Sequence, residues 1–349
     1  MNRIHIDGRA IGPEYPPYVI AELSANHNGL LENALRIIDE AKKAGADAVK
    51  LQTYTPDTLT LDCDSEDFRI RGGLWDGYTL YELYRQASMP WEWHAPLFEH
   101  ARKAGITIFS SPFDRTAVDL LEDLDAPAYK IASFEVIDLP LISYAASTGK
   151  PLIISTGMAD ADEIREAIEA ARGGGCTELS VLHCVSGYPA PASDYNLRTI
   201  PDMVDRFGLV TGLSDHTLDN STAIASVALG AAIIEKHVTL DRGAGGPDDK
   251  FSLEPPELLA LCRGVRTAWE ALGGVNYSCK SSELPNVKFR RSLYFVRDLK
   301  AGETITEDAV RSVRPGYGLP PKLLPQVLGA RVRMDVRKNT PVTREKLVN

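Results

Sequence analysis

The sequence predicts an α/β protein: a (β/α)8 TIM barrel followed by a small C-terminal domain. Three observations support this prediction. Eight short apolar runs alternate with amphipathic helical stretches between residues 18 and 272. Each run ends in polar or charged residues, as strands do in barrel enzymes, whose active sites lie where the following loops converge. After residue 272 the chain becomes rich in Gly, Ser and Asn, a composition typical of a linker.

The expected strands are 18–23, 48–53, 107–112, 128–133, 151–156, 178–184, 210–216 and 233–238. Helical spacing of apolar residues predicts helices at 31–45, 91–105, 115–125, 160–172 and 221–231. Apolar strands joined by helices pair in parallel and are buried on both faces. Eight such units in about 255 residues fit a barrel. A doubly wound sheet is the alternative, but ELSANHNG at 22–29 is not the glycine-rich phosphate turn that such folds use.

The longest insertion lies between Tyr54 and Pro90 and contains aromatic residues at 75, 78, 81 and 84, with a further one at 91. Because function in barrels is carried by the loops after strands, a substrate lid is one interpretation. Ordinary helix packing is the other, since Tyr81 and Tyr84 have i, i+3 spacing.

The predicted domains are a catalytic barrel at 1–272, a linker at 273–289 and a small domain at 290–349. The small domain is too short to bury a large core by itself. We therefore expect it to pack against the barrel or against a partner chain.

The charge balance excludes some partners. The 349 residues include 38 Lys+Arg and 48 Asp+Glu, a formal net charge of -10, which disfavours nucleic acids and anionic membranes but allows a small anion in a local basic pocket. Five scattered cysteines without a C-x-x-C pair indicate reduced thiols. No signal-peptide core and no apolar run of about 18 residues is present. We expect a cytoplasmic protein.

The polar strand ends predict the site. Lys50 and Lys130 each follow an apolar run, and with nearby hydroxyls they would hold a phosphate and a carboxylate. An ion pair with a neighbouring carboxylate is the alternative for each lysine. Lys236 is adjacent to His237 and should point to the opposite face of its strand.

Two of the seven histidines, His216 and His237, end consecutive strands. Two imidazoles with water and carboxylate oxygens suit Mn, Fe or Zn, although a lone histidine is more often an ordinary packed residue. Glu22 and Glu135 could bind a metal or a substrate hydroxyl, or perform acid–base catalysis. Asp248, in the glycine-rich GAGGPDDK, belongs to a closing loop or is a solvated loop residue.

The motifs AELSANHNG, AVKLQT, FSSPFD, AYKIASFE, STGM, LHCVSGYP, GLSDHTLD, EKHVT, GGPDDKFSL and SVRPGYG occur in this order along nearly the whole chain. In this it resembles the sialic acid synthase family, enzymes that condense phosphoenolpyruvate with an N-acetylated sugar, and its C-terminal segment resembles their SAF (antifreeze-like) domain.

The resemblance implies a role for each matching residue. The divalent metal, with Mn²⁺ expected and Mg²⁺ or Co²⁺ as alternatives, would be held by His216 and His237. Phosphoenolpyruvate contacts would be Lys50, Ser111, Lys130, Ser133, Ser155 and Ser214. Sugar-binding and acid–base positions would include Glu22, Gln52, Glu135, Tyr188 and Asp248, with Glu22, Glu135 and His237 as catalytic residues. Arg314, in the RPG motif, would reach the site of the neighbouring subunit in a domain-swapped homodimer.

One departure bears on the substrate. Sialic acid synthases tend to carry Asn-x-Tyr where this chain has Ser186-Gly187-Tyr188, which argues against N-acetylmannosamine. Through RGGLWDGYTLYELYRQASMPWEWH the resemblance is closest to the pseudaminic acid synthases of the family, which implies a 2,4-diacetamido-2,4,6-trideoxy-L-altrose substrate and a product for surface glycans or flagellin.

The sequence also allows other functions. Within the family they are N-acetylneuraminate, legionaminate and spore-coat polysaccharide synthesis. A Schiff-base aldolase using Lys50 or Lys130 is a different mechanism, and a non-catalytic carbohydrate-binding barrel is a different class.

Overall fold

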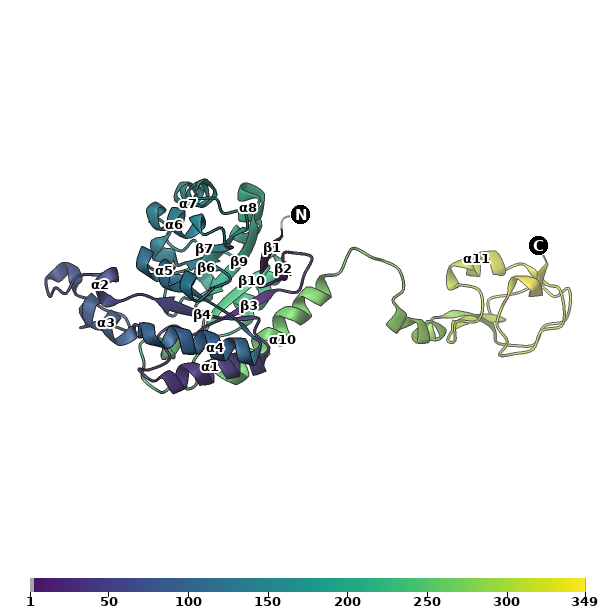
Figure 1. The fold of residues 1–349 in the computed structure, drawn as a ribbon. Helices are drawn as coiled ribbons and strands as arrows, with labels where there is room; N and C mark the ends of the chain where they lie inside the picture. The colour runs from purple at the N-terminus through teal and green to yellow at the C-terminus, as the bar shows by residue number, and fades with distance from the viewer. Residues whose placement is uncertain (1–2, 349) are drawn as a thin grey trace. The chain divides into compact units, whose positions relative to one another are not determined.

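The computed structural model describes residues 3–348. The chain forms two compact units, Met1–Gly273 and Gly274–Asn349, which are described separately (Figure 1). The sequence predicts the linker at 273–289 and the small domain at 290–349, and these finer limits stay predictions.

The first unit is a closed barrel of eight parallel strands in the order β10-β3-β4-β5-β6-β7-β8-β9. Every strand lies within two residues of a predicted run at each end, so the predicted (β/α)8 barrel is confirmed. The strands are β3 (Tyr18–Glu22), β4 (Ala48–Thr53), β5 (Thr107–Pro112), β6 (Tyr129–Ile131), β7 (Leu152–Ser155), β8 (Leu179–Cys184), β9 (Val210–Asp215) and β10 (Ile233–His237).

Helices cover the outside of the barrel (Figure 1). The predicted helix at 91–105 begins with a 3-10 turn, Trp91–Trp93, because the α-helix proper starts at His94. The helices are α1 (Leu31–Ala44), α4 (His94–Ala104), α5 (Arg115–Asp123), α6 (Leu139–Ser147), α7 (Ala161–Gly173), α8 (Thr199–Phe207), α9 (Ser221–Ala228) and α10 (Pro255–Leu272).

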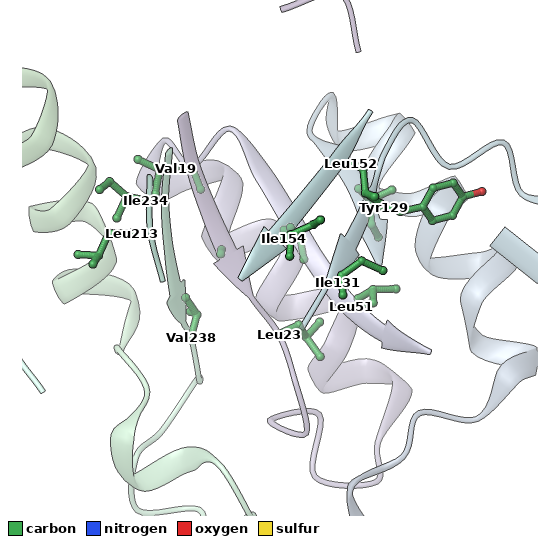
Figure 2. Packing of buried hydrophobic residues seen from close by; sticks show 14 of the residues in the cluster. Val19, Leu23, Leu51, Tyr129, Ile131, Leu152, Ile154, Leu213, Ile234 and Val238 are labelled. Atoms are coloured by element: carbon green, nitrogen blue, oxygen red, sulfur yellow. The ribbon is translucent and has the colours of Figure 1, made fainter. Parts of the chain in front are cut away.

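Successive strand residues alternate between the helix layer and the barrel interior. Val19, Leu51, Ile154 and Ile234 belong to the large cluster between strands and helices (Figure 2). A second buried cluster fills the N-terminal half of the interior with residues of the other parity, such as Ile20. Going toward the C-terminal ends of the strands, the inward side chains therefore change from apolar to polar.

A short antiparallel hairpin, β1 (Ile4–Ile6) with β2 (Arg9–Ile11), adds Ile4, Ile6 and Ile11 to the interior cluster. This hairpin is not among the predicted elements. The signal for it is nevertheless present, because the pair Asp7-Gly8 separates Ile-His-Ile from Arg-Ala-Ile, and both turn residues have positive φ (50° and 75°), as a two-residue hairpin turn requires. The interior is thus packed with apolar side chains at one end only, and the polar end carries the candidate site.

The long insertion after β4 is folded. It contains α2 (Pro56–Leu59), a 3-10 turn at Glu66–Phe68 and α3 (Leu80–Ala87). Capping boxes begin α2 at Thr55 and α3 at Thr79, and an antiparallel bridge joins Arg69 to Thr79. These local bonds fix the segment as a structured element rather than a loose loop.

The second unit has a small core of its own, which includes Leu293, Phe295, Ile305, Val332 and Val342. It pairs β11 (Ser292–Phe295) with β12 (Val310–Val313) and β13 (Arg331–Val332) with β14 (Leu347–Val348), and contains the short helix α11 (Leu324–Val327). Among residues 3–348, no helix combines the length and the hydropathy that crossing a bilayer requires.

Gly212 of β9 tests how tightly the strands pack. A Cβ there would meet the carbonyl oxygen of Ile233 and would lie 2.6 Å from a methyl group of Leu182. We predict that Gly212→Ala destabilises the protein by about 1–3 kcal/mol through overpacking. Gly173, where a Cβ would meet nothing within 4 Å, is the matched control. Chemical denaturation measures both, and an unchanged midpoint for Gly212→Ala would contradict the packing described.

Candidate functional site

A cavity of about 490 Å³ opens at the C-terminal ends of the barrel strands, a volume suited to a small ligand. Eleven of the predicted site residues line it: Lys50, Gln52, Lys130, Ser133, Glu135, Ser155, Tyr188, Ser214, His216, His237 and Asp248. Two others, Glu22 and Ser111, are buried and contact Lys50. Arg314 lies in the second unit as an exposed residue, and its predicted contact with a neighbouring subunit stays a prediction.

Two lysines and two glutamates meet inside the barrel, and each of these residues is 4% exposed or less. The ammonium group of Lys50 lies 2.6 Å from Glu22 and 3.9 Å from Glu235, and that of Lys130 lies 3.4 Å from Glu235. The lysines therefore both line the cavity and form the ion pairs that were the alternative interpretation. The predicted site omitted Glu235, although it shares the inward parity of His237, two residues away.

Burial and charge together set the ionisation of these groups. Burial raises the pKa of Glu22 to about 7, although Lys50 opposes the shift. Burial would also raise the pKa of Glu235, but Lys130 and Lys50 outweigh it and hold that pKa below its usual value. For Lys50 burial is outweighed by Glu22 and Glu235, so its pKa is raised. Lys50 and Glu235 are consequently charged at neutral pH.

A hydrogen-bonded chain connects this cluster to the loop after β10. The amide of Gln52 donates to Glu22 at 2.9 Å and to the hydroxyl of Ser24 at 3.1 Å. The Ser24 hydroxyl in turn donates to Asp248. Asp248 thus belongs to the cavity wall and is not a solvated loop residue.

Two further carboxyl groups suit proton transfer. Burial raises the pKa of Glu135 to about 7, so it can exist in either protonation state near neutral pH. Burial also raises the pKa of Asp248. Both groups line the cavity.

The two histidines lie side by side, with ring centroids 5.3 Å apart. Nδ1 of His216 lies 2.8 Å from the carbonyl oxygen of Val185, which fixes the proton on Nδ1 and leaves Nε2 free to bind an ion. Burial and the nearby cations lower the pKa of His237 well below its usual value, so its imidazole is neutral. Its buried Nδ1 has no hydrogen-bond partner among residues 3–348.

These nitrogen donors fit a divalent ion. Within the described part of the chain, no group of three or more His, Cys, Asp or Glu side chains is arranged to hold a metal. The protein would therefore supply two histidine ligands and leave the other positions to water or substrate.

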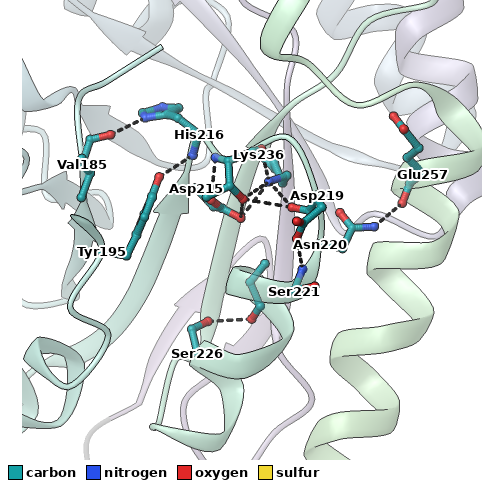
Figure 3. Close-up of polar contacts among 12 residues, drawn as sticks. Val185, Tyr195, Asp215, His216, Asp219, Asn220, Ser221, Ser226, Lys236 and Glu257 are labelled. Atoms are coloured by element: carbon teal, nitrogen blue, oxygen red, sulfur yellow. Dashed lines mark hydrogen bonds and ion pairs between the residues drawn. The ribbon is translucent and has the colours of Figure 1, made fainter. Parts of the chain in front are cut away.

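Lys236 lies outside the cavity, as predicted. Its ammonium group contacts Asp215 at 2.7 Å and the backbone oxygens of Thr217 and Asp219 at 2.7 and 2.8 Å (Figure 3). These contacts hold the loop after β9, in which the backbone N–H of His216 donates to the Tyr195 hydroxyl at 2.6 Å. The buried pair therefore supports the loop that carries one of the two histidines.

Of the aromatic residues singled out at 75, 78, 81, 84 and 91, two line the cavity: Trp75 and Tyr84. The indole N–H of Trp75 donates to the carbonyl oxygen of Pro247 at 2.9 Å. Tyr81 does not line the cavity, and its hydroxyl donates a hydrogen bond to Asp57. Sequence reasoning missed Cys184 in the cavity lining, although its inward parity at the end of β8 would have indicated it.

Comparison with known proteins identifies the family. The sequence profile of the NeuB family matches residues 37–277, and that of the SAF domain matches residues 290–348. The chain belongs to the NeuB family. The resemblance to sialic acid synthases and their SAF domain is thereby confirmed.

Named relatives are similar over almost the whole chain. Pseudaminic acid synthase of Campylobacter jejuni is 46% identical over 92% of this chain and 93% of its own length. The Helicobacter pylori protein of the same name is 42% identical over 95% and 98%. Among solved structures, N-acetylneuraminic acid synthetase of Leptospira borgpetersenii in complex with citrate has a TM-score of 0.73 and 31% identity, over 82% of this chain and 95% of that chain.

The buried pair behind His216 yields a stability prediction. Lys236→Met leaves Asp215 buried without its cation, so we expect a loss of about 3–5 kcal/mol of unfolding free energy. Lys43→Met is the matched control, because Lys43 is paired with Glu40 at the same 2.7 Å distance but on the surface, and we expect no measurable change. Equal denaturation midpoints for the two variants would contradict a supporting role for Lys236.

Proposed function

We propose that this chain is a pseudaminic acid synthase. It condenses phosphoenolpyruvate with 2,4-diacetamido-2,4,6-trideoxy-L-altrose and water, and releases phosphate by cleavage of a C–O bond. The observation that carries the proposal is that two lysines and two histidines open onto one cavity. The identity of 46% to the Campylobacter jejuni enzyme supports the choice of sugar.

In this proposal the lysines bind phosphoenolpyruvate. The ammonium groups of Lys50 and Lys130 receive its phosphate and carboxylate, helped by the hydroxyls of Ser111, Ser133, Ser155 and Ser214. Charge-assisted hydrogen bonds of this kind are about twice as strong as neutral ones. The ligand oxygens replace part of the contacts that Glu22 and Glu235 make to the lysines.

The sugar lies next to phosphoenolpyruvate in the cavity, against Gln52, Tyr188 and Asp248. His216 and His237 would hold a divalent ion, for which we propose Mn²⁺, with Mg²⁺ or Co²⁺ as alternatives. When bound, such an ion supplies Lewis-acid polarisation of the aldehyde oxygen. We further propose a cytoplasmic homodimer in which Arg314 of one subunit completes the cavity of the other.

The reaction follows from this arrangement. C3 of phosphoenolpyruvate attacks C1 of the open-chain sugar, forming the new C–C bond, and the aldehyde oxygen takes up a proton. Water adds to C2 and loses one proton, which leaves a hydroxyl on C2. This hydroxyl loses its proton as the bond between C2 and the phosphate oxygen breaks, and a ketone and inorganic phosphate, which takes up that proton, are left. Glu135 and Glu22, with pKa values raised to about 7, are the groups we assign to these proton transfers.

A Schiff-base aldolase would need a neutral lysine as nucleophile. Lys50 is held in its charged form by Glu22 and Glu235, which disfavours this route for Lys50. Burial lowers the pKa of Lys130 although Glu235 opposes the shift, so Lys130 is the lysine that a trapping experiment must test. Borohydride would trap the protein covalently on substrate if a Schiff base formed.

A phosphate-release assay with phosphoenolpyruvate and a panel of sugars tests the proposal. We predict release with the diacetamido-trideoxy-altrose at a kcat/KM well above that for N-acetylmannosamine or the legionaminate precursor. A preference for N-acetylmannosamine would overturn the substrate assignment. No release with any amino sugar would favour a non-catalytic carbohydrate-binding barrel.

The same assay also tests whether the reaction requires a divalent metal ion. A chelator should abolish release and Mn²⁺ should restore it. Undiminished release in excess chelator, after exhaustive dialysis, would remove the ion from the mechanism.

A further inference from the structure

The cavity has two chemically different halves. Its floor consists of polar and charged side chains at the strand ends, such as Lys50, Lys130 and Glu235. The insertion after β4 also lines the cavity, and every lining residue that it contributes is apolar or aromatic; further apolar lining residues, such as Phe113 and Phe251, come from other loops. We call six side chains of the insertion the apolar wall: Leu59, Ile70, Trp75, Leu80, Leu83 and Tyr84.

The wall is held in place by contacts within the protein. Trp75 is fixed by its hydrogen bond to Pro247, so the indole N–H is already used and the ring offers carbon surface to the cavity. Tyr84 packs edge-on against Tyr54, with ring centroids 6.0 Å apart. Local capping of α3 and the bridge between Arg69 and Thr79 hold the backbone behind these side chains.

Ring contacts show where the wall lies relative to the histidines. The ring centroids of Tyr188 and His216 are 4.4 Å apart, and those of Trp75 and Tyr188 are 5.7 Å apart. Among the described residues no ring contact joins Trp75 to either histidine. Trp75 is therefore one ring further from the histidine pair than Tyr188 is.

The reacting ends of the two substrates must meet at the polar floor, because the lysines that receive phosphoenolpyruvate are there. The aldehyde carbon of the sugar consequently lies at the floor, near His216 and His237. The other end of the six-carbon chain extends past Tyr188 toward the apolar wall.

We infer that the apolar wall binds the C6 methyl end of the sugar and selects 6-deoxy hexoses over their 6-hydroxy counterparts. The inference rests on the proposed function and specifies how its substrate is recognised. A methyl group against Leu59 and Ile70 loses only water, whereas a hydroxyl there gives up hydrogen bonds to water that leucine and isoleucine cannot replace. A hydrophobic pocket rejects an added hydroxyl by up to about 100-fold.

The test compares kcat/KM for phosphate release with 2,4-diacetamido-2,4,6-trideoxy-L-altrose and with the same sugar carrying a 6-hydroxyl. We expect the wild-type protein to prefer the 6-deoxy sugar by about 10- to 100-fold. Leu59→Asn and Ile70→Asn should each lower this ratio at least about fivefold, mainly through KM for the 6-deoxy sugar, because each supplies a partner for the hydroxyl. KM for phosphoenolpyruvate should stay unchanged.

Leu61→Asn is the matched control, since Leu61 lies two residues from Leu59 but is 66% exposed and does not line the cavity. Its ratio should equal that of wild type, and thermal unfolding should show all three variants folded. Two wall variants are used so that the loss of one by misfolding leaves the other.

Three outcomes overturn the inference. Equal kcat/KM values of the wild-type protein for the two sugars, or unchanged ratios in both wall variants, would remove the wall from substrate selection while leaving the proposed function intact. No phosphate release with either sugar, while N-acetylmannosamine is used, would refute the proposed function and this inference with it.

Discussion

The site depends on two lysines and two glutamates buried together inside the barrel. Removing Lys50, Lys130, Glu22 and Glu235 from water is costly, and only their mutual attraction makes such burial tolerable. The cluster lies where the interior changes from apolar to polar, between the packed isoleucines of the N-terminal hairpin and the open cavity. A ligand with two anionic groups meets lysines that are already positioned by carboxylates.

This arrangement explains how an acidic protein can bind an anion. The formal net charge of -10 describes the whole surface, whereas the cavity presents two ammonium groups that are each 3% exposed or less. The predicted local basic pocket needs one refinement, because the lysines are ion-paired with carboxylates. The low dielectric around the ion pairs makes each charged contact stronger than it would be in water. The affinity for an anionic ligand, whose oxygens replace some of the carboxylate contacts to the lysines, therefore depends strongly on each of these charges.

Much of the barrel could be predicted from the sequence, because strands buried on both faces appear as continuous apolar runs. The parity of residues along each strand then placed Lys50, Lys130 and His237 at one opening and Lys236 on the opposite face. What the sequence could not show is which side chains pair across neighbouring strands. The pairing of Glu235 with two lysines depends on strand register, and the bond from Trp75 to Pro247 joins segments 172 residues apart.

We propose that Lys130, held by Glu235, binds phosphoenolpyruvate. Calorimetric titration of phosphoenolpyruvate into the wild-type protein and into Lys130→Met tests it most directly, with Lys150→Met, whose ion pairs to Glu122 and Asp125 lie away from the cavity, as the control. Losing a hydrogen bond to a charged group costs about 1.5–3 kcal/mol, so the account predicts a Kd raised about 10- to 150-fold in Lys130→Met and unchanged in Lys150→Met. An unchanged Kd in a folded Lys130→Met protein would contradict it.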